Sequence, residues 1–326
     1  MKRTALALGL AAAAFAGLQA QTAKVDAGLT PYQKVSGISG SMNSVGSDTM
    51  NNMMTLWAEE FRKMYPNVKI QVEGKGSSTA PPALISGTSQ FGPMSRQMRA
   101  TELDQFQLKY GYKPTELRTS HDALAVYVHR DNPITKLTLA QVEAIFGKSR
   151  RRGYKQNITT WGQLGLTGEW ASRPISIYGR NSASGTYGFF KEHVLKNGDY
   201  KDTVKEQPGS ASVVQGVTED RFAIGYSGIG YKTSGVKVVP LSETESSPVS
   251  DGSQADVVSG KYPLSRFLYI YINRAPNKPL DPLVAEFTKL IFSKEGQEVV
   301  IKDGYMPISA DIAKTELAKI TGKSGT

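Results

Sequence analysis

The stretch YGRNSASGTYGFF, Tyr178–Phe190, joins a β-like segment to a helical pattern through a loop of glycine, serine and threonine. The start of a helix leaves about four backbone N–H groups unpaired and carries roughly half a positive charge. Because glycine allows close approach of the backbone and hydroxyl groups add donors, such a junction can bind an anion without a metal. The stretch therefore predicts a strand, a polar loop and a helix, with an anion site at the loop.

Two other loops have the same composition: VGSDTM, Val45–Met50, and GKGSSTAPPALISG, Gly74–Gly87. A single loop of this kind would be ordinary, because serine, threonine and aspartate are common helix caps. Three in one chain, the last with Arg180 shortly before Ser184, favour an oxyanion site, since arginine offers a charged, bidentate fork.

A fourth loop, FGPMSRQM at Phe91–Met98, places Ser95 and Arg96 after an apolar segment. If Arg96 were buried without an anion, the cost would be high, whereas on the surface it would be unremarkable. Both interpretations of Arg96 stay open at this point.

From Ser41 onward, β-like runs alternate with helical patterns. VKIQVEG at 68–74 and DALAVYVHR at 122–130 are predicted strands. After Asp48, methionine and aromatic residues recur every three or four positions up to Met64, which is one apolar face of a helix. Further strands are predicted at 173–179, 222–228, 236–241 and 266–274, and helices at 138–148 and 283–302. This alternation indicates an α/β protein with largely parallel sheets.

The first twenty residues, MKRTALALGLAAAAFAGLQA, have Lys2 and Arg3 before an apolar run and small residues up to Ala20. They predict a secretory signal peptide cleaved after Ala20, because the run is too short to span a membrane. The chain has no cysteine, so neither a lipid anchor nor a disulfide is expected. We expect a protein exported to a bacterial periplasm or beyond, with residues 21–40 as a flexible arm.

Composition argues against several other classes of function. The net charge of +10 could suit nucleic acid, but that needs basic and aromatic residues interleaved on one face. The dense basic cluster, Lys148–Arg152, is typical of a solvated loop, although it could also face an acidic surface in an adhesive role. No nucleic-acid partner is therefore predicted.

The residues needed by an exported hydrolase, the main alternative from another class, are not found. The chain has no Gly-x-Ser-x-Gly elbow, and its three histidines have no metal-ligand spacing. GKS at 322–324 lacks the earlier glycine and the strand of a phosphate-binding P-loop. We predict a protein that is not an enzyme, with no catalytic residues, metal or cofactor.

At the four loops above, and at AIGYSGIGY (223–231) and KDGYMPI (302–308), the chain resembles the periplasmic phosphate-binding proteins of the ABC-type phosphate importer. The motifs follow the order and spacing of that family over most of residues 41–310. The resemblance implies a two-lobed, type II periplasmic-binding-protein fold, with a mixed, mostly parallel sheet in each lobe and two hinge crossovers. It also implies a monomer that closes on one inorganic phosphate and delivers it to an inner-membrane ABC permease.

The resemblance further implies crossovers near 122–128 and 262–270, so that one lobe comprises residues 41–122 plus 268–326 and the other 123–267. It implies these phosphate ligands: Ser47, Asp48, Thr49, Met50, Ser77, Ser95, Arg96, Arg180, Ser184, Gly185 and Thr186. Better-known members carry an aspartate after the serine of the fourth loop, where it accepts the proton of phosphate, and here that position is Arg96. Asp48 is the candidate replacement, with a plain N-cap as its alternative role. Another tetrahedral oxyanion, such as sulfate or a phosphate ester, also remains a candidate ligand.

Overall fold

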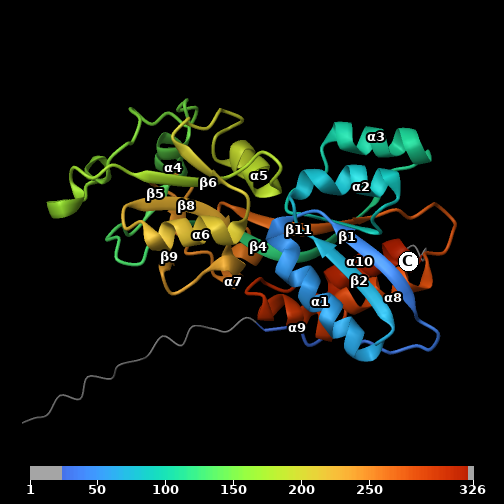
Figure 1. Ribbon diagram of the computed structural model, residues 1–326. Helices are drawn as coiled ribbons and strands as arrows, with labels where there is room; N and C mark the ends of the chain where they lie inside the picture. Colours follow the sequence, from blue (N-terminus) through green and yellow to red (C-terminus); the bar gives the residue numbers. More distant parts are fainter. Residues whose placement is uncertain (1–23, 322–326) are drawn as a thin grey trace, which may run out of the picture.

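The computed structural model describes residues 24–321. The expected signal peptide and the GKS stretch lie outside the described residues. Figure 1 shows two lobes: the N-terminal and C-terminal parts of the chain, in blue and red, build one, and the middle of the chain, in green and yellow, builds the other. The fold class predicted from the sequence, a two-lobed α/β protein, is confirmed.

One mixed sheet runs through both lobes in the order β2-β1-β3-β11-β4-β8-β6-β7, with β9 beside β4. The strands are β1 (Gly40–Val45), β2 (Val68–Glu73), β3 (Phe91–Met94), β4 (Thr115–His129), β6 (Ser176–Arg180), β7 (Val204–Gln207), β8 (Ala223–Gly228), β9 (Val236–Val238) and β11 (Ser265–Ile272). A separate pair is formed by β5 (Leu137–Thr138) and β10 (Leu241–Ser242). The pairings β1–β2, β1–β3, β6–β7 and β6–β8 are parallel, and every antiparallel pair includes β4 or β11.

Strand β4 joins the two lobes. Its first part pairs with β11 up to Ala123, and from Leu124 onward it pairs with β8. The strand begins at Thr115, seven residues before the start predicted from the apolar run. The predicted strand was too short because residues 115–121 are mostly charged and polar and lack an apolar pattern. Tertiary contacts stabilise these residues in the structure: Arg118, for example, pairs with the buried Glu316.

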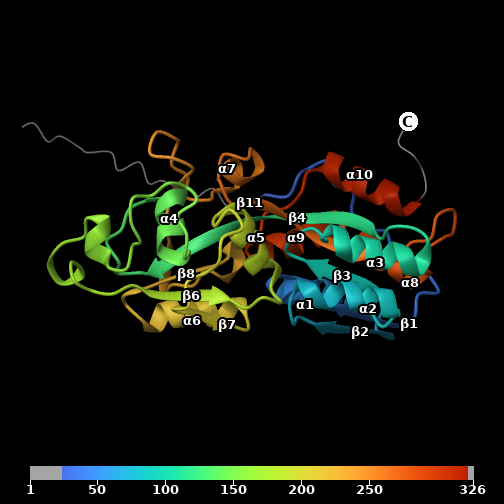
Figure 2. The same cartoon turned by 90° about the horizontal axis from the view of Figure 1, so that it is seen from above.

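The first lobe carries α1 (Asn51–Met64), α2 (Ala80–Ser86), α3 (Ala100–Tyr110), α8 (Pro282–Ile291), α9 (Lys294–Lys302) and α10 (Ala310–Thr321). The second carries α4 (Leu139–Phe146), α5 (Gly185–His193), α6 (Ser210–Glu219) and α7 (Gln254–Val258). Helix α1 buries the predicted apolar face, with Trp57 and Phe61 fully covered. Seen from above, α5 lies at the boundary between the lobes (Figure 2).

The single helix predicted at 283–302 is wrong: the chain forms α8 and α9, with a break at Phe292 and Ser293. Ser293 caps α9 by accepting a hydrogen bond from the N–H of Gly296. A side chain at 296 would meet the carbonyl oxygen of Leu290 at 2.0 Å, so only glycine fits the break. The carbonyl of Gly296 then accepts a hydrogen bond of 2.7 Å from the indole of Trp57.

The N-terminal segment makes more contacts than the expected flexible arm would make. Over the part that the structure describes, Leu29 is buried and the carboxylate of Asp26 accepts from the N–H of Ala310. Tyr32 donates to Glu286 with its hydroxyl and to Glu295 with its backbone N–H. These contacts tie residues 26–32 to the helices at the C-terminal end of the chain.

The basic cluster at Lys148–Arg152 is only partly solvated. The backbone N–H groups of Arg151 and Arg152 donate to the buried carboxylate of Glu143. The side chain of Arg152 is 9% exposed and donates to the carbonyl oxygens of His193 and Val194 at the C-terminal end of α5. Part of the cluster is therefore structural, because its cations stabilise the end of a helix.

Candidate functional site: a hydroxyl cluster between the lobes

Four hydroxyl side chains from separate parts of the sequence meet between the lobes. Thr49 and Thr186 are 2.9 Å apart between their Oγ1 atoms, Ser95 Oγ is 3.4 Å from Thr186 Oγ1, and Ser77 Oγ is 3.3 Å from Ser95 Oγ. All four side chains are buried. We call Thr49, Ser77, Ser95 and Thr186 the hydroxyl cluster. Each was predicted from the sequence, and the structure brings all four together.

Helix α5 begins at the hydroxyl cluster. Ser184 caps it, because its Oγ accepts hydrogen bonds from the N–H groups of Thr186 and Tyr187. A Cβ atom at Gly185 would lie 2.3 Å from Ser77 Oγ and 2.6 Å from Ser95 Oγ, distances that atoms do not reach. Glycine at 185 therefore allows the first turn of α5 to touch the other lobe, with its positive end at the cluster.

Arg180 and Asp48 face each other across the lobe boundary. The guanidinium of Arg180 is 1% exposed, donates to Ser210 Oγ at 2.7 Å and lies 3.3 Å from Asp48 Oδ2. Burial lowers the pKa of Arg180, whereas the charge of Asp48 works in the opposite direction. An arginine this deeply buried needs an anionic partner, and Asp48 provides one.

Asp48 caps a helix, but not the helix that the sequence suggested. Its Oδ2 accepts a hydrogen bond of 2.7 Å from the N–H of Ser210, the first residue of α6 in the opposite lobe. The turn that leads into α1 has no side-chain cap. Asp48 therefore links the two lobes through the positive end of α6, and an N-cap role toward its own helix is not observed.

Arg96 is turned toward its own lobe. Its two terminal nitrogens each donate to a carboxylate oxygen of Glu102, both at 2.7 Å. Although burial works to raise the pKa of Glu102, the hydrogen bonds from Arg96 and the nearby cations lower it. The anion that a buried Arg96 needs is therefore Glu102, and from this loop only Ser95 joins the hydroxyl cluster.

Ser47 and Met50 shape the loop before α1. The N–H of Ser47 donates to the carbonyl of Pro93, and Met50 is fully buried in the core of the first lobe. The motifs at 223–231 and 302–308 stabilise the same loop. Tyr231 and Tyr305 donate to the carbonyl oxygens of Asp48 and Thr49, respectively. These contacts fix the position of the Thr49 hydroxyl.

Arg266, which the sequence analysis did not select, also reaches the hydroxyl cluster. Its Nη2 donates to Thr186 Oγ1 at 3.0 Å and its Nη1 to the carbonyl of Ser95 at 2.8 Å. Its Nε donates to Asp122, which is fully buried and also accepts from the N–H of Ile229. The sequence did contain a signal for this pair, because Asp122 and Arg266 each begin a predicted crossover strand. A charged residue is costly to bury there unless it pairs with an opposite charge.

Three further findings concern metal ligands, histidine and membrane-spanning helices. Within 24–321, no cluster of three or more histidine, cysteine, aspartate or glutamate residues could hold a metal ion. His121 lies in β4 against Phe267, and burial lowers its pKa to about 4. Over the same residues, no helix combines the length and the apolar character needed to cross a bilayer.

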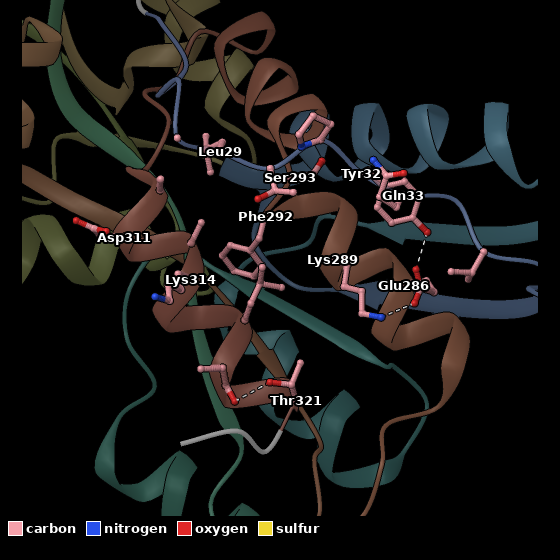
Figure 3. A pocket seen from close by; sticks show the side chains of 18 residues that line it. Leu29, Tyr32, Gln33, Glu286, Lys289, Phe292, Ser293, Asp311, Lys314 and Thr321 are labelled. Carbon is pink, nitrogen blue, oxygen red and sulfur yellow. Dashed lines mark hydrogen bonds and ion pairs between the residues drawn. The ribbon is translucent and has the colours of Figure 1, made fainter. Parts of the chain in front are cut away.

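A cavity of about 1140 Å³ lies elsewhere (Figure 3), between the N-terminal segment, α8 and α10. Leu29, Phe292 and Leu317 contribute an apolar wall. The charge of Glu286 on its rim is paired with Lys289 at 2.6 Å. The cavity shares no residue with the hydroxyl cluster and lacks its convergence of donors. The cluster is the place where hydroxyls, a helix N-terminus and a buried arginine converge, which suits an oxyanion.

Comparisons with known proteins identify the family of the chain. The family model described as a PBP superfamily domain matches residues 33–295. The chain is 54% identical over 320 residues to the phosphate-binding protein PstS of Pseudomonas aeruginosa, covering 98% of this chain and 99% of that one.

Two solved structures are similar as well. One, described as a phosphate ABC transporter substrate-binding protein with bound phosphate from Clostridium perfringens, has a TM-score of 0.68 at 26% identity and covers 83% of this chain and all of its own. The other, a possible phosphate-binding protein from Planctomyces limnophilus, has a TM-score of 0.63 at 27% identity, over 88% of this chain and 99% of its own. The chain thus belongs to the PBP superfamily and, within it, to the family of the phosphate-binding protein PstS.

Proposed function

We propose that the protein binds inorganic phosphate between its lobes and delivers it to an ABC-type phosphate permease in the inner membrane. The observation that carries the proposal is the meeting of Thr49 and Ser95 from one lobe with Thr186 from the other, beside Arg266. Membership of the PstS family supports phosphate as the ligand. An anion held by groups of both lobes would favour the closed arrangement, which a permease can sense.

The proposed site comprises the residues that the resemblance implied, together with Arg266. Thr49, Ser77, Ser95 and Thr186 supply hydroxyl groups, and Gly185 lets the start of α5 approach. Arg180, which faces Asp48 across the lobe boundary, supplies charge. Ser47, Met50, Ser184 and Arg96 act mainly by positioning these groups through the contacts described above.

We keep Asp48 as the proposed acceptor of the proton of phosphate. Among the described residues, the hydrogen bond from Ser210 N–H and the ion pair with Arg180 both involve Oδ2, so Oδ1 can accept another hydrogen bond. Sulfate near neutral pH has no proton to donate, and an unmatched carboxylate would repel it, so a carboxylate here would favour phosphate.

The wider organisation is proposed on the same basis. One lobe would comprise residues 41–122 plus 268–326 and the other residues 123–267, because β4 changes partner between Ala123 and Leu124 and β11 begins at Ser265. We further propose that residues 1–20 are removed on export, and that the protein acts in the periplasm, or outside the cell, as a monomer without enzymatic activity.

Titration calorimetry on protein stripped of ligand tests the binding. Phosphate is expected to bind with a dissociation constant of about 1 µM or below, and Arg180→Ala to weaken binding by about 2–5 kcal/mol, as for a buried charge pair. Arg221→Ala is the matched control, because Arg221 pairs with Glu169 on the surface. Heat with sulfate and none with phosphate would overturn the proposal, and a loss below ~0.5 kcal/mol would place Arg180 outside the site.

A further inference from the structure

A second cavity, of about 1000 Å³, opens beside the hydroxyl cluster at the boundary between the lobes. Its walls are the loop from Arg96 to Arg99 before α3, the outer side of α5, and β11 from Ser265 to Tyr269. Both lobes therefore contribute to it. We call this cavity the vestibule.

Arg266 connects the vestibule with the hydroxyl cluster. Its side chain lines the vestibule, and the same guanidinium donates to Thr186 Oγ1 in the cluster. The ring of Phe189 packs over it, with the guanidinium carbon 5.2 Å from the ring centre. An anion at this end of the vestibule would be separated from the hydroxyl cluster by one cation and one aromatic ring.

The charged residues that line the vestibule are mainly cationic. Arg96, Arg99, Lys191 and Arg266 line it, whereas Glu192 is the acidic residue among the lining side chains. Three of these cations have acidic partners: Arg96 pairs with Glu102, Lys191 with Asp199 and Arg266 with Asp122. These pairings reduce the field of the three cations without cancelling it.

Arg99 differs from the other cations of the vestibule. It is exposed and takes part in no ion pair among residues 24–321. A methyl group on Gly188, in α5 of the opposite lobe, would lie 3.8 Å from its Nη2, so the guanidinium of Arg99 reaches across the lobe boundary. The nearby carboxylate of Glu102 accepts a hydrogen bond from the backbone N–H of Arg99 and is paired with Arg96, so it reduces the field of Arg99 without forming an ion pair with it. The guanidinium of Arg99 is thus left to meet an anion that arrives from solvent.

We propose that the vestibule collects inorganic oxyanions, with Arg99 as the first contact and Arg266 as the link to the hydroxyl cluster. This inference rests on the proposed function, and adds a route of entry to it. A concave surface lined by one sign of charge concentrates counter-ions and speeds their association, and salt weakens the effect. Arg99 would therefore affect the rate of association, because the bound phosphate would contact the hydroxyl cluster and not Arg99.

The test compares the rates at which inorganic phosphate associates with variants at position 99. Because the chain has no cysteine, Lys75→Cys provides a single site for a fluorophore. Position 75 lies in a loop that contacts the other lobe, because the N–H of Ser78 in this loop donates to the carbonyl of Ala183. A fluorophore at position 75 should therefore report closure of the lobes in stopped-flow mixing. All variants carry this label.

At low ionic strength, Arg99→Glu is expected to slow association about 3- to 10-fold, and Arg99→Gln by less, because it removes less charge. The difference from the parent should shrink as salt approaches about 1 M. The controls are Lys109→Glu and Lys109→Gln, which change the net charge equally. Lys109 is exposed, lies in the last turn of α3, the helix that follows Arg99, and is outside the vestibule. Their association rates should change less than 2-fold.

Equal slowing by the substitutions at 99 and 109 would overturn the proposal, because net charge alone would then set the rate. Unchanged rates, or slowing that does not depend on salt, would overturn it as well. These outcomes leave phosphate binding at equilibrium intact. Failure of the proposed function would look different, since the labelled parent protein would not bind phosphate at all.

Discussion

At the scale of single residues, the site depends on buried arginines that each have an acidic partner. Arg180 lies beside Asp48, and Arg266 donates to Asp122. Removing water from a charge costs several kcal/mol, so an unpaired arginine here would destabilise the fold. The acidic partners also reduce the positive charge that an arriving anion meets. Their negative charge can therefore discriminate between anions that carry a proton and anions that do not.

Asp48 allows this idea to be tested. Asp48→Asn keeps an oxygen that can accept from Ser210 N–H but removes the negative charge beside Arg180. The ratio of phosphate to sulfate affinity, measured by calorimetry, is expected to fall about tenfold or more. The exposed carboxylate of Asp202 provides the control, since Asp202→Asn should leave the ratio unchanged. An unchanged ratio in Asp48→Asn would assign the proton acceptor to another group.

At the scale of elements, the strand–loop–helix junction carries the site. Helix α5 brings three features to the boundary: the Thr186 hydroxyl, the positive end of the helix dipole, and the absence of a side chain at 185. Its cap, Ser184, uses its hydroxyl within the helix. The junction works only if the opposite lobe can approach the backbone, so the size of residue 185 should control closure.

Gly185→Ala should therefore impair binding more than folding. The added methyl would lie 2.3 Å from Ser77 Oγ across the boundary, which holds the lobes apart. We expect phosphate affinity to fall about 100-fold, a loss of about 2.7 kcal/mol, with little change in the unfolding midpoint. Gly188→Ala serves as the control, because its methyl would be 3.4 Å from the nearest atom, in the flexible side chain of Arg96. Equal affinity of both variants would show that α5 does not need this close approach.

At the scale of the whole molecule, the lobes also meet where the turn after α9 contacts the second lobe. A Cβ atom at Gly230 would lie 2.5 Å from the carbonyl oxygen of Asp303. The Oδ2 atom of Asp303 is buried with no hydrogen-bond partner among the described residues, and burial raises the pKa of Asp303 to about 7. Tyr231 and Tyr305 lie near this carboxyl group.

The raised pKa of Asp303 predicts a pH effect on stability. Between about pH 4 and pH 7 the folded protein holds a proton on Asp303 that the unfolded chain releases, so this group lowers the free energy of unfolding as pH rises. Asp303→Asn removes the cost of the buried charge. It should match the wild type near pH 4 and be more stable at pH 8 in urea unfolding.

The comparison between variant and wild type isolates Asp303 from His121. Because the pKa of His121 is lowered to about 4, its own contribution to stability rises between about pH 4 and pH 6.5, and it is present in both proteins. Asp311→Asn, at an exposed position on α10, is the control. If the stability difference between Asp303→Asn and the wild type does not change with pH, the carboxyl group of Asp303 is not buried as the structure shows it.

Prediction from the sequence succeeded where a local pattern carried the information. The apolar spacing of α1 and the alternation in β2 follow from the periods of helix and strand, which the chain expresses without help from distant residues. It failed where distant contacts decide: the polar first part of β4 is stabilised by pairing with β11, and the break between α8 and α9 by a contact with Trp57. Neither partner is close in sequence.

The sequence by itself determined the α/β class, the polar loops that open helices and the hydroxyl residues that they carry, because turn chemistry and helix capping are local. Only the tertiary structure decided how buried charges pair. In the structure Arg96 pairs with Glu102, Asp48 caps α6 in the other lobe, and Arg266 donates to Thr186. The physical reason is that a buried charge must find its partner in space, and residues far apart in the sequence supply that partner.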